Sequence, residues 1–243
     1  MPRIHLENVS HRYSDETALR EVSLTFADDV TTAVVGRSGS GKSTMLQCIN
    51  GLVRPTRGTV RVFDSAIDYD ALPALRRKIG YAVQGTGLFP HMTVEANITL
   101  LARLERWDPD RTRARADELM GLVELPREYL GRYPSELSGG QQQRVGLCRA
   151  MMLDPPLFLL DEPFGALDPI TRREIHSEFV RLQESAPRTI VLVTHDLHEA
   201  VRLARRLVIF EDGRVAQHDD TDVVLREPAN QFVADLIASQ LGN

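Results

Sequence analysis

The chain has 243 residues, a formal net charge of −5 and a hydrophobic fraction of 42%. This length and composition are typical of one large globular domain or of two closely joined subdomains, and they exclude a disordered or fibrous protein. The acidic balance argues against nucleic acid as the main partner, and no apolar run reaches the roughly 18–20 residues that span a bilayer. The N-terminus lacks a secretory signal, and Cys48 and Cys148 form no disulfide framework. We therefore expect the protein to lie in a reducing cytosol, and we assign neither cysteine a redox role.

The pattern of apolar residues predicts two kinds of strand. Near the N-terminus apolar and polar residues alternate, which is typical of an antiparallel sheet with one face in water. The alternating apolar positions are Ile4, Leu6, Val22, Leu24 and Phe26. Further on, residues 33–35, 157–160 and 190–193 are continuous apolar runs. Such runs indicate strands buried on both faces, as in a parallel sheet covered by helices.

A glycine-rich loop follows the strand at 33–35. Residues 36–43 read GRSGSGKS and match G-x-x-x-x-G-K-[ST] between a buried strand and a predicted helix. In this motif successive N–H groups point at phosphate oxygens, and the helix N-terminus adds partial positive charge. Lys42 reaches the β- and γ-phosphates, and the Ser43 hydroxyl ligates Mg²⁺. The predicted triphosphate contacts are Gly36, Arg37, Ser38, Gly39, Ser40, Gly41, Lys42, Ser43 and Thr44.

A strand is predicted at Ile79–Gln84, and between about residues 86 and 150 the pattern is mostly helical and rich in arginine. One helix in this part begins at the string LSGGQQQR, where Ser138 and Gln141 have the spacing of a capping box. Its N-terminus is a second place at which an anion could bind.

The strand at 157–160 ends in two carboxylates, Asp161 and Glu162. In nucleotide triphosphatases with this loop, the first acid holds Mg²⁺ and the second orients or deprotonates the attacking water. Downstream, Asp168 and Asp196 are predicted to cap two helices. A last helix is predicted at Phe232–Leu241.

The motifs together resemble those of the ATP-binding subunits of ATP-binding cassette (ABC) transporters, over essentially the whole chain. The resemblance implies an α/β fold with a P-loop NTPase core built on a parallel sheet. It also implies an N-terminal antiparallel β subdomain and an inserted α-helical subdomain. On this basis residues 1–85 and 151–243 form the core with its β annex, and residues 86–150 form the helical signature subdomain.

The resemblance also implies roles for single residues. Tyr13 stacks on adenine, Gln84 contacts Mg²⁺ and the attacking water, and His195 contacts the γ-phosphate. Two copies associate head to tail, so that the ATP held by residues 36–44 of one copy is closed over by the signature of the other. The residues contributed across this dimer are Ser138, Gly139, Gly140, Gln141 and Asp168.

Four phrases resemble the osmoprotectant importer ATPases, which serve glycine betaine, choline or carnitine. They are YAVQGTGLFPHMTVEANI, RYPSELSGGQQQRV, DEPFGALDPITR and REPANQFVADLI. The resemblance implies a separate integral-membrane permease that docks near residues 87–94, and indirectly a substrate-binding protein. It places the chain in the cytoplasm, peripheral on the inner membrane. Many such ATPases continue into CBS regulatory domains, and we expect none after residue 243.

Other functions stay open at this stage. The solute could be an amino acid or a related small molecule, and an exporter remains possible. A non-transport ABC ATPase is less favoured, because Ser138 lies only 96 positions after Lys42, too few for the coiled-coil insertion of repair proteins. A small-molecule kinase would have no use for LSGGQ or for the histidine. The sequence assigns no role to Lys78.

Overall fold

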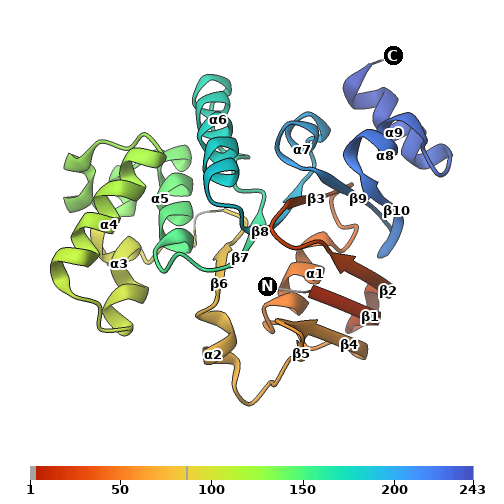
Figure 1. Ribbon diagram of the computed structural model, residues 1–243, viewed down its shortest axis with the longest axis horizontal. Coiled ribbons are helices and arrows are strands. Elements are labelled where there is room, and N and C mark those ends of the chain that lie inside the picture. The colour runs from red at the N-terminus through yellow and green to blue at the C-terminus, as the bar shows by residue number, and fades with distance from the viewer. Residues whose placement is uncertain (1–3, 86, 243) are drawn as a thin grey trace. The chain divides into compact units, whose positions relative to one another are not determined.

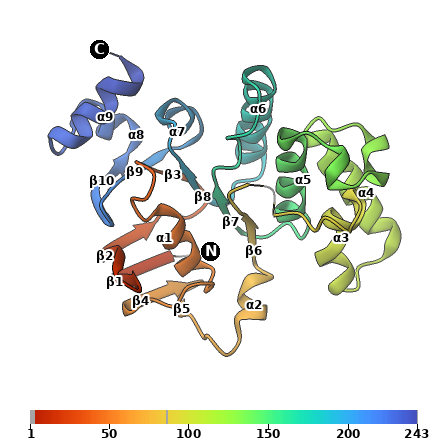
Figure 2. The same ribbon diagram turned by 180° about the vertical axis from the view of Figure 1, so that it is seen from behind.

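The computed structural model describes residues 4–85 and 87–242 (Figures 1 and 2). Outside the described residues lie Met1–Arg3, Thr86 and Asn243, at which the predicted core and helical subdomain begin or end. Internal contacts divide the chain into two compact units. Unit 1 comprises Met1–Arg76 and Pro187–Asn243, and unit 2 comprises Arg77–Ala186. The helical subdomain expected at residues 86–150 stays a prediction.

Unit 1 contains the predicted antiparallel sheet. Its strands are β1 (Ile4–Tyr13), β2 (Glu16–Phe26), β4 (Arg57–Val62) and β5 (Ser65–Ala66), in the order β2-β1-β4-β5. Ile4 lies opposite Phe26 and Leu6 opposite Leu24, and all four side chains are buried. The alternation in the sequence therefore corresponds to one buried face of this sheet.

A second sheet of unit 1 has the strand order β10-β9-β3-β8. Strand β3 (Thr31–Gly36) runs parallel to β8 (Thr189–Thr194) and β9 (Arg206–Glu211), while β10 (Arg214–Asp220) is antiparallel to β9. Every residue of β3 and β8 is buried, which confirms the interpretation of the continuous apolar runs. The helices of unit 1 are α1 (Lys42–Ile49), α2 (Leu72–Arg76), α7 (Leu197–Leu203), α8 (Thr221–Arg226) and α9 (Gln231–Leu241).

Unit 2 pairs two parallel strands, β6 (Ile79–Ala82) and β7 (Leu157–Asp161). The strand predicted to reach Gln84 is two residues too long. The reason is that the ladder ends at the pair Ala82–Leu160, and only Asp161 of β7 follows. The helices are α3 (Val94–Leu104), α4 (Pro109–Leu122), α5 (Gly139–Met151) and α6 (Pro169–Ser185), with 3₁₀ turns η1 (Arg127–Gly131) and η2 (Pro134–Glu136).

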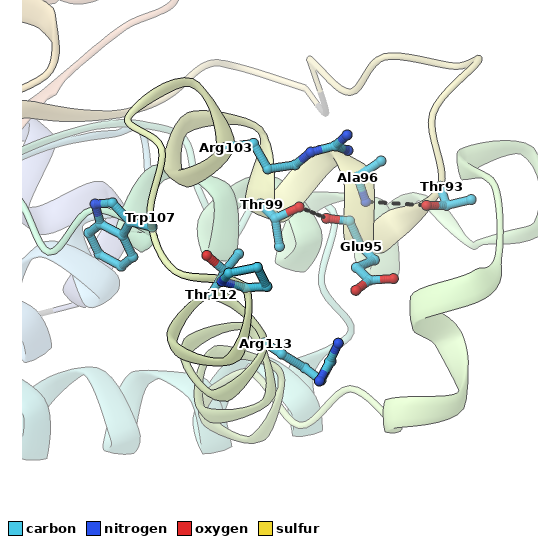
Figure 3. Close-up of a pocket in the computed structure, with 9 residues that line it drawn as sticks. Thr93, Glu95, Ala96, Thr99, Arg103, Trp107, Thr112 and Arg113 are labelled. Carbon is cyan, nitrogen blue, oxygen red and sulfur yellow. Dashed lines mark hydrogen bonds between the residues drawn. The ribbon is translucent and has the colours of Figure 1, made fainter.

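Helices α3 and α4 enclose a pocket of about 380 Å³ (Figure 3). Its hydroxyl groups already have partners, because Thr99 donates to the carbonyl of Glu95 at 2.7 Å and Thr93 accepts an N–H of the first turn of α3. Arg103 and Arg113 also line the pocket. We assign it no ligand.

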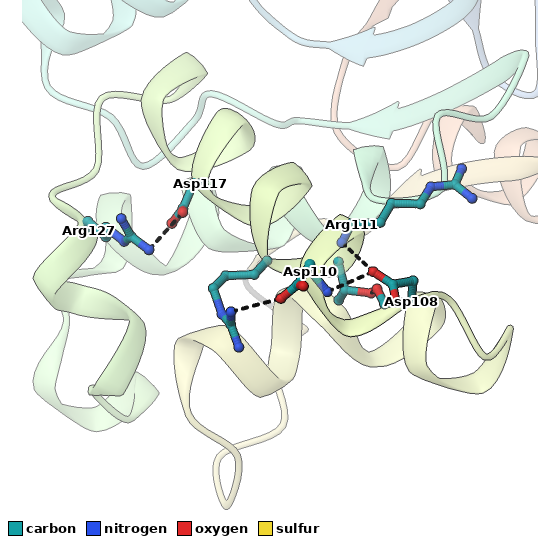
Figure 4. A network of polar contacts seen from close by, with 7 residues as sticks. Asp108, Asp110, Arg111, Asp117 and Arg127 are labelled. Carbon is teal, nitrogen blue, oxygen red and sulfur yellow. Dashed lines mark hydrogen bonds and ion pairs between the residues drawn. The ribbon is translucent and has the colours of Figure 1, made fainter.

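The start of α4 is stabilised by polar contacts (Figure 4). The carboxylate of Asp108 accepts the N–H groups of Asp110 and Arg111, both at 3.0 Å, a cap that contributes about 0.5–2 kcal/mol. Further along the helix, Asp117 pairs with Arg127 at 2.9 Å.

Over residues 4–85 and 87–242, no helix has both the length and the apolar character that crossing a membrane requires.

Candidate functional site

The loop after β3 has a backbone that requires glycine. Gly41 has φ +100°, and a Cβ added there would lie 2.2 Å from the carbonyl oxygen of Ala18. A Cβ on Gly36 would lie 2.3 Å from the carbonyl oxygen of Phe210. Both distances are far below van der Waals contact, so side chains at these positions would push the loop away from the strands beside it.

The ammonium group of Lys42 lies inside this loop. Its Nζ donates to the carbonyl oxygens of Gly36 and Arg37, each at 2.8 Å, and the residue is only 5% exposed. Gly41, the N-cap of α1, makes no side-chain hydrogen bond to the helix. The first turn of α1 therefore places a cation beside helix N–H groups whose N-cap residue has no side chain, which is the arrangement that binds a phosphate.

Neighbouring strands hold the loop in place. The N–H of Gly213, in the turn between β9 and β10, donates to the carbonyl of Ser40 at 3.0 Å. The carbonyl of Gly213 in turn accepts the N–H of Arg20 at 2.8 Å. A hollow of about 760 Å³ beside this turn includes Gly39 in its lining. The loop is therefore supported from one side and open at Gly39.

Tyr13 is an exposed ring at the end of β1. It is 45% exposed, and its hydroxyl donates to Oε1 of Gln47 on α1 at 3.3 Å. The ring of His11 meets it edge-on, with the centroids 4.5 Å apart. Because α1 starts at the phosphate loop, this contact links the aromatic ring to the helix that carries Lys42.

His195 follows the carboxyl end of β8. The register of β3 and β8 pairs Val35 with Thr194, so His195 and the phosphate loop leave adjacent parallel strands at the same edge, where ligands bind in such sheets. The predicted cap is confirmed, since Asp196 accepts the N–H groups of His198 and Glu199 at 2.9 and 3.2 Å. Helix α7 ends at Leu203, with Ala204 as its C-cap.

The two predicted carboxylates lie at the end of β7 in unit 2. Asp161 is 2% exposed, and Glu162 has the left-handed backbone conformation, with φ +49°. The side chain of Gln143 donates to the Glu162 carbonyl at 2.7 Å and accepts the N–H of Ala166 at 2.8 Å. This buried amide holds the turn that carries Glu162. Sequence reasoning missed Gln143, whose only signal is its place in the glutamine run of LSGGQQQR.

The signature segment forms the start of α5 as predicted. Ser138 and Gln141 make a reciprocal capping box: the Ser138 hydroxyl accepts from Gln141 N and the Gln141 side chain accepts from Ser138 N. Gly140 lies so near the Ala166 carbonyl that a Cβ would be 2.9 Å from it. Asp168 caps α6, and hydrogen bonds from the side chain and backbone of Thr171 hold the pKa of Asp168 below its ordinary value.

Gln84 lies in an exposed bend two residues after β6. Since β6 and β7 are parallel and Ala82 pairs with Leu160, Gln84 and Asp161 lie at the same carboxyl end of this strand pair. The segment after the bend includes Phe89, which is 41% exposed. Asn97 of α3 holds that segment: its amide donates to the carbonyl of Met92 at 3.1 Å and accepts the N–H of Phe89 at 2.8 Å.

The predicted site residues therefore fall into two groups. Unit 1 brings together Tyr13, residues 36–44 and His195. Unit 2 brings together Gln84, Asp161 and Glu162 at one strand edge, and the segments 138–141 and 161–168 through Gln143 and Gly140. The proposed metal ligands Ser43, Gln84 and Asp161 all present oxygen, the ligand atom that Mg²⁺ prefers.

Comparisons with known proteins identify similar sequences and a similar structure. The family profile described as "ABC transporter" matches residues 19–165. The glycine betaine/carnitine/choline transport ATP-binding protein OpuCA of Bacillus subtilis (strain 168) is 46% identical over 98% of this chain and 63% of its own length. The glycine betaine uptake system ATP-binding protein YehX of Escherichia coli (strain K12) is 44% identical over 98% of this chain and 78% of its own length. The chain thus spans less than two thirds of the Bacillus protein.

A solved structure is similar as well. It is described as the dimeric structure of a post-hydrolysis state of the ATP-binding cassette MJ0796 bound to ADP and Pi. It superposes with a TM-score of 0.85 at 34% identity, covering 90% of this chain and 98% of that one. These matches confirm the predicted α/β fold class and the resemblance inferred from the motifs.

Proposed function

The chain belongs to the ABC transporter family, and from this premise we propose that it is the ATP-hydrolysing motor of an importer of osmoprotectants. The proposed solutes are glycine betaine, choline and carnitine, which the names of its relatives contain, or a similar quaternary amine. The observation that carries the ATPase proposal is the buried Lys42 ammonium inside the phosphate loop.

ATP binding uses the residues of unit 1. The N–H groups at the start of α1 and the Lys42 ammonium receive the β- and γ-phosphates. The exposed ring of Tyr13 stacks on adenine, and His195 contacts the γ-phosphate. To reach a phosphate, Lys42 exchanges its bonds to the neutral Gly36 and Arg37 carbonyls for bonds in which both the donor and the acceptor carry charge.

Hydrolysis uses the strand edge of unit 2. When bound, Mg²⁺ neutralises phosphate charge, with Ser43, Asp161 and Gln84 as its proposed ligands. Glu162 orients the attacking water and accepts its proton. Its backbone is held in place by Gln143, so the point from which the side chain leaves the chain is set before the water arrives.

The active assembly is a head-to-tail homodimer, as the dimeric description of the MJ0796 cassette supports. In it Ser138, Gly139, Gly140 and Gln141 of one copy close over the ATP of the other, and Asp168 makes a further contact across the dimer. Hydrolysis removes the phosphate that joins the halves, so the dimer opens. The cycle is a two-state switch biased by ligand.

The partners are integral-membrane permease subunits, served by a substrate-binding protein, so the chain works on the cytoplasmic face of the inner membrane. We place permease docking at residues 87–94. This segment presents the exposed ring of Phe89 and is held from behind by Asn97, which is fully buried. A rigid, partly apolar surface of this kind suits a transient protein contact.

The Glu162→Gln variant tests the ATPase mechanism. We expect ATP affinity within twofold of the wild type, hydrolysis lowered at least ~100-fold, and accumulation of an ATP-bound dimer in size-exclusion chromatography. Glu184→Gln on the exposed side of α6 removes the same charge and should keep full activity. Wild-type turnover by Glu162→Gln would show that another group activates the water.

Uptake assays test the solute. A strain deleted for this chain is complemented with the wild type or with Glu162→Gln and given labelled glycine betaine, choline, carnitine or amino acids. We expect uptake of a quaternary amine that needs the active chain. Uptake of only an amino acid would replace the osmoprotectant proposal with the alternative solute class, and no dependence of any uptake on the chain would favour a non-transport ABC ATPase.

A further inference from the structure

The C-terminal helix α9 contacts both segments of unit 1 that carry proposed nucleotide contacts. Both ribbon views show it on the same side of unit 1 as α7 (Figures 1 and 2). At its first turn, Phe232 lies under the guanidinium of Arg37 in the phosphate loop, at 5.6 Å from the ring centroid. At its last turn, Gln240 contacts the backbone around His195.

The amide of Gln240 bridges the two sides of the His195 segment. Its Nε2 donates to the carbonyl oxygen of His195 at 3.1 Å, and its Oε1 accepts the N–H of Leu197 at 2.7 Å. Leu197 is the first residue of α7, so this bond satisfies an N–H that the helix itself leaves open. One planar group thus sets the spacing between the histidine carbonyl and the start of the helix.

Gln240 completes a set of bonds made locally by the same segment. The Asp196 N–H donates to the Thr194 hydroxyl at 3.1 Å, and the Asp196 carboxylate caps the next turn of α7. These contacts come from residues within the β8–α7 connection, whereas Gln240 is 45 positions from His195. The His195 side chain is exposed, and the direction in which it leaves the chain is set by the backbone of this segment.

The position of Gln240 is itself determined by apolar packing. Val233 is fully buried in a cluster with residues of β3, β9 and α7, and Phe232, Leu236 and Ile237 pack against the same cluster. Gln240 follows them at helical spacing, on the inward face. Gln240 is half-buried, and its two side-chain bonds both go to the His195 segment.

We propose that Gln240 is a positioning residue for ATP hydrolysis: it holds the backbone of His195 so that the imidazole meets the γ-phosphate. The inference rests on the proposed function, because it assigns His195 that contact. Gln240 touches no nucleotide itself and acts only through the histidine. Its loss therefore lowers turnover and leaves ATP binding nearly unchanged, since the phosphate loop and Tyr13 remain intact.

The test compares Gln240→Met, which keeps the size of the side chain and removes both bonds, with Gln231→Met at the exposed start of α9. In the full-length chain we expect Gln240→Met to lower kcat about tenfold with KM for ATP within twofold. Gln231→Met should match the wild type. Gln240→Glu, which keeps an acceptor for Leu197 and loses the donor to His195, should also lower kcat if Gln240→Met does not fold.

A double-mutant cycle separates positioning from a structural role. With His195→Ala, adding Gln240→Met should change kcat less than twofold. The inference is overturned if Gln240→Met keeps full kcat while His195→Ala loses it, or if Gln240→Met has the same effect in both backgrounds. If His195→Ala itself keeps wild-type kcat, the role of His195 in the proposed function fails as well, which is a different result from failure of Gln240 alone.

Discussion

The bridge made by Gln143 allows a quantitative prediction. Gln143 is 6% exposed, and its amide joins the Glu162 carbonyl to the Ala166 N–H. Gln143→Met keeps the volume and removes two neutral hydrogen bonds, at about 0.5–1.5 kcal/mol each, so unfolding free energy should fall by about 1–3 kcal/mol. For a chain of this size that lowers the midpoint of thermal unfolding by about 2–12 °C.

The same change should reduce hydrolysis more than binding. Without the bridge the left-handed turn at Glu162, a conformation that costs of order 1–3 kcal/mol in a non-glycine residue, loses two of its supports. We expect kcat to fall about tenfold or more, with ATP affinity unchanged. Thermal melts and steady-state ATPase assays measure both effects.

The matched control is Gln142→Met. Gln142 is the neighbouring glutamine on α5, and its amide donates to the Leu137 carbonyl at 3.1 Å, away from Glu162. Gln142→Met should lower the unfolding free energy by about half as much as Gln143→Met and leave kcat unchanged. An unchanged melt and turnover for Gln143→Met would refute the reasoning, as would an equal loss of turnover in Gln142→Met.

Two further predictions concern the loop and the cysteines. Gly41→Ala places a Cβ 2.2 Å from the Ala18 carbonyl and should lower ATP affinity at least ~10-fold in equilibrium binding measurements. The control is Gly121→Ala, where an added Cβ meets no atom within 4 Å and ATP should bind normally. Equal ATP affinities of the two variants would contradict the steric argument. Burial raises the pKa of Cys48 and of Cys148 from 9.0 to about 12. In denaturant titrations the unfolding free energy should therefore be fully retained below pH 9 and decrease from pH 9 to 12. Maleimide should label the two thiols only after unfolding. Labelling of the native chain at pH 8 would contradict the burial of the thiols.

The parts of the fold that the sequence predicted are those with local signals. The buried strands β3, β7 and β8 were visible because a strand covered on both faces needs apolar residues at every position. The caps at Ser138, Asp168 and Asp196 were visible because short polar side chains at helix starts have a characteristic spacing. The phosphate loop was visible because its glycine-rich motif directly follows a buried strand.

The end of β6 had no such signal. Val83 continues the apolar pattern beyond Ala82, and only the register with β7 ends the strand there. Pairing between strands that are 78 positions apart is not encoded in either segment alone. The same limit applies to Gln143, Gln240 and Asn97, since a single amide on a helix is ordinary in any sequence.

Amide side chains were nevertheless the right residues to support these loops. Each of Asn97, Gln143 and Gln240 donates to a backbone carbonyl and accepts a backbone N–H within the same loop, which requires a donor and an acceptor on one planar group. A carboxylate would face the carbonyl with negative charge, and an ammonium has nothing that accepts the N–H.

The bridge alone does not indicate a role in catalysis. Gln217 on β10 makes the same pair of bonds, to the Glu227 carbonyl and the Ala229 N–H, both at 2.8 Å, in a linker where no nucleotide contact is proposed. What distinguishes Gln143 and Gln240 is the backbone that they hold, which leads directly to Glu162 and His195. Loss of the Gln217 bridge should therefore change stability more than turnover, whereas loss of the other two should change turnover through the residue each one supports.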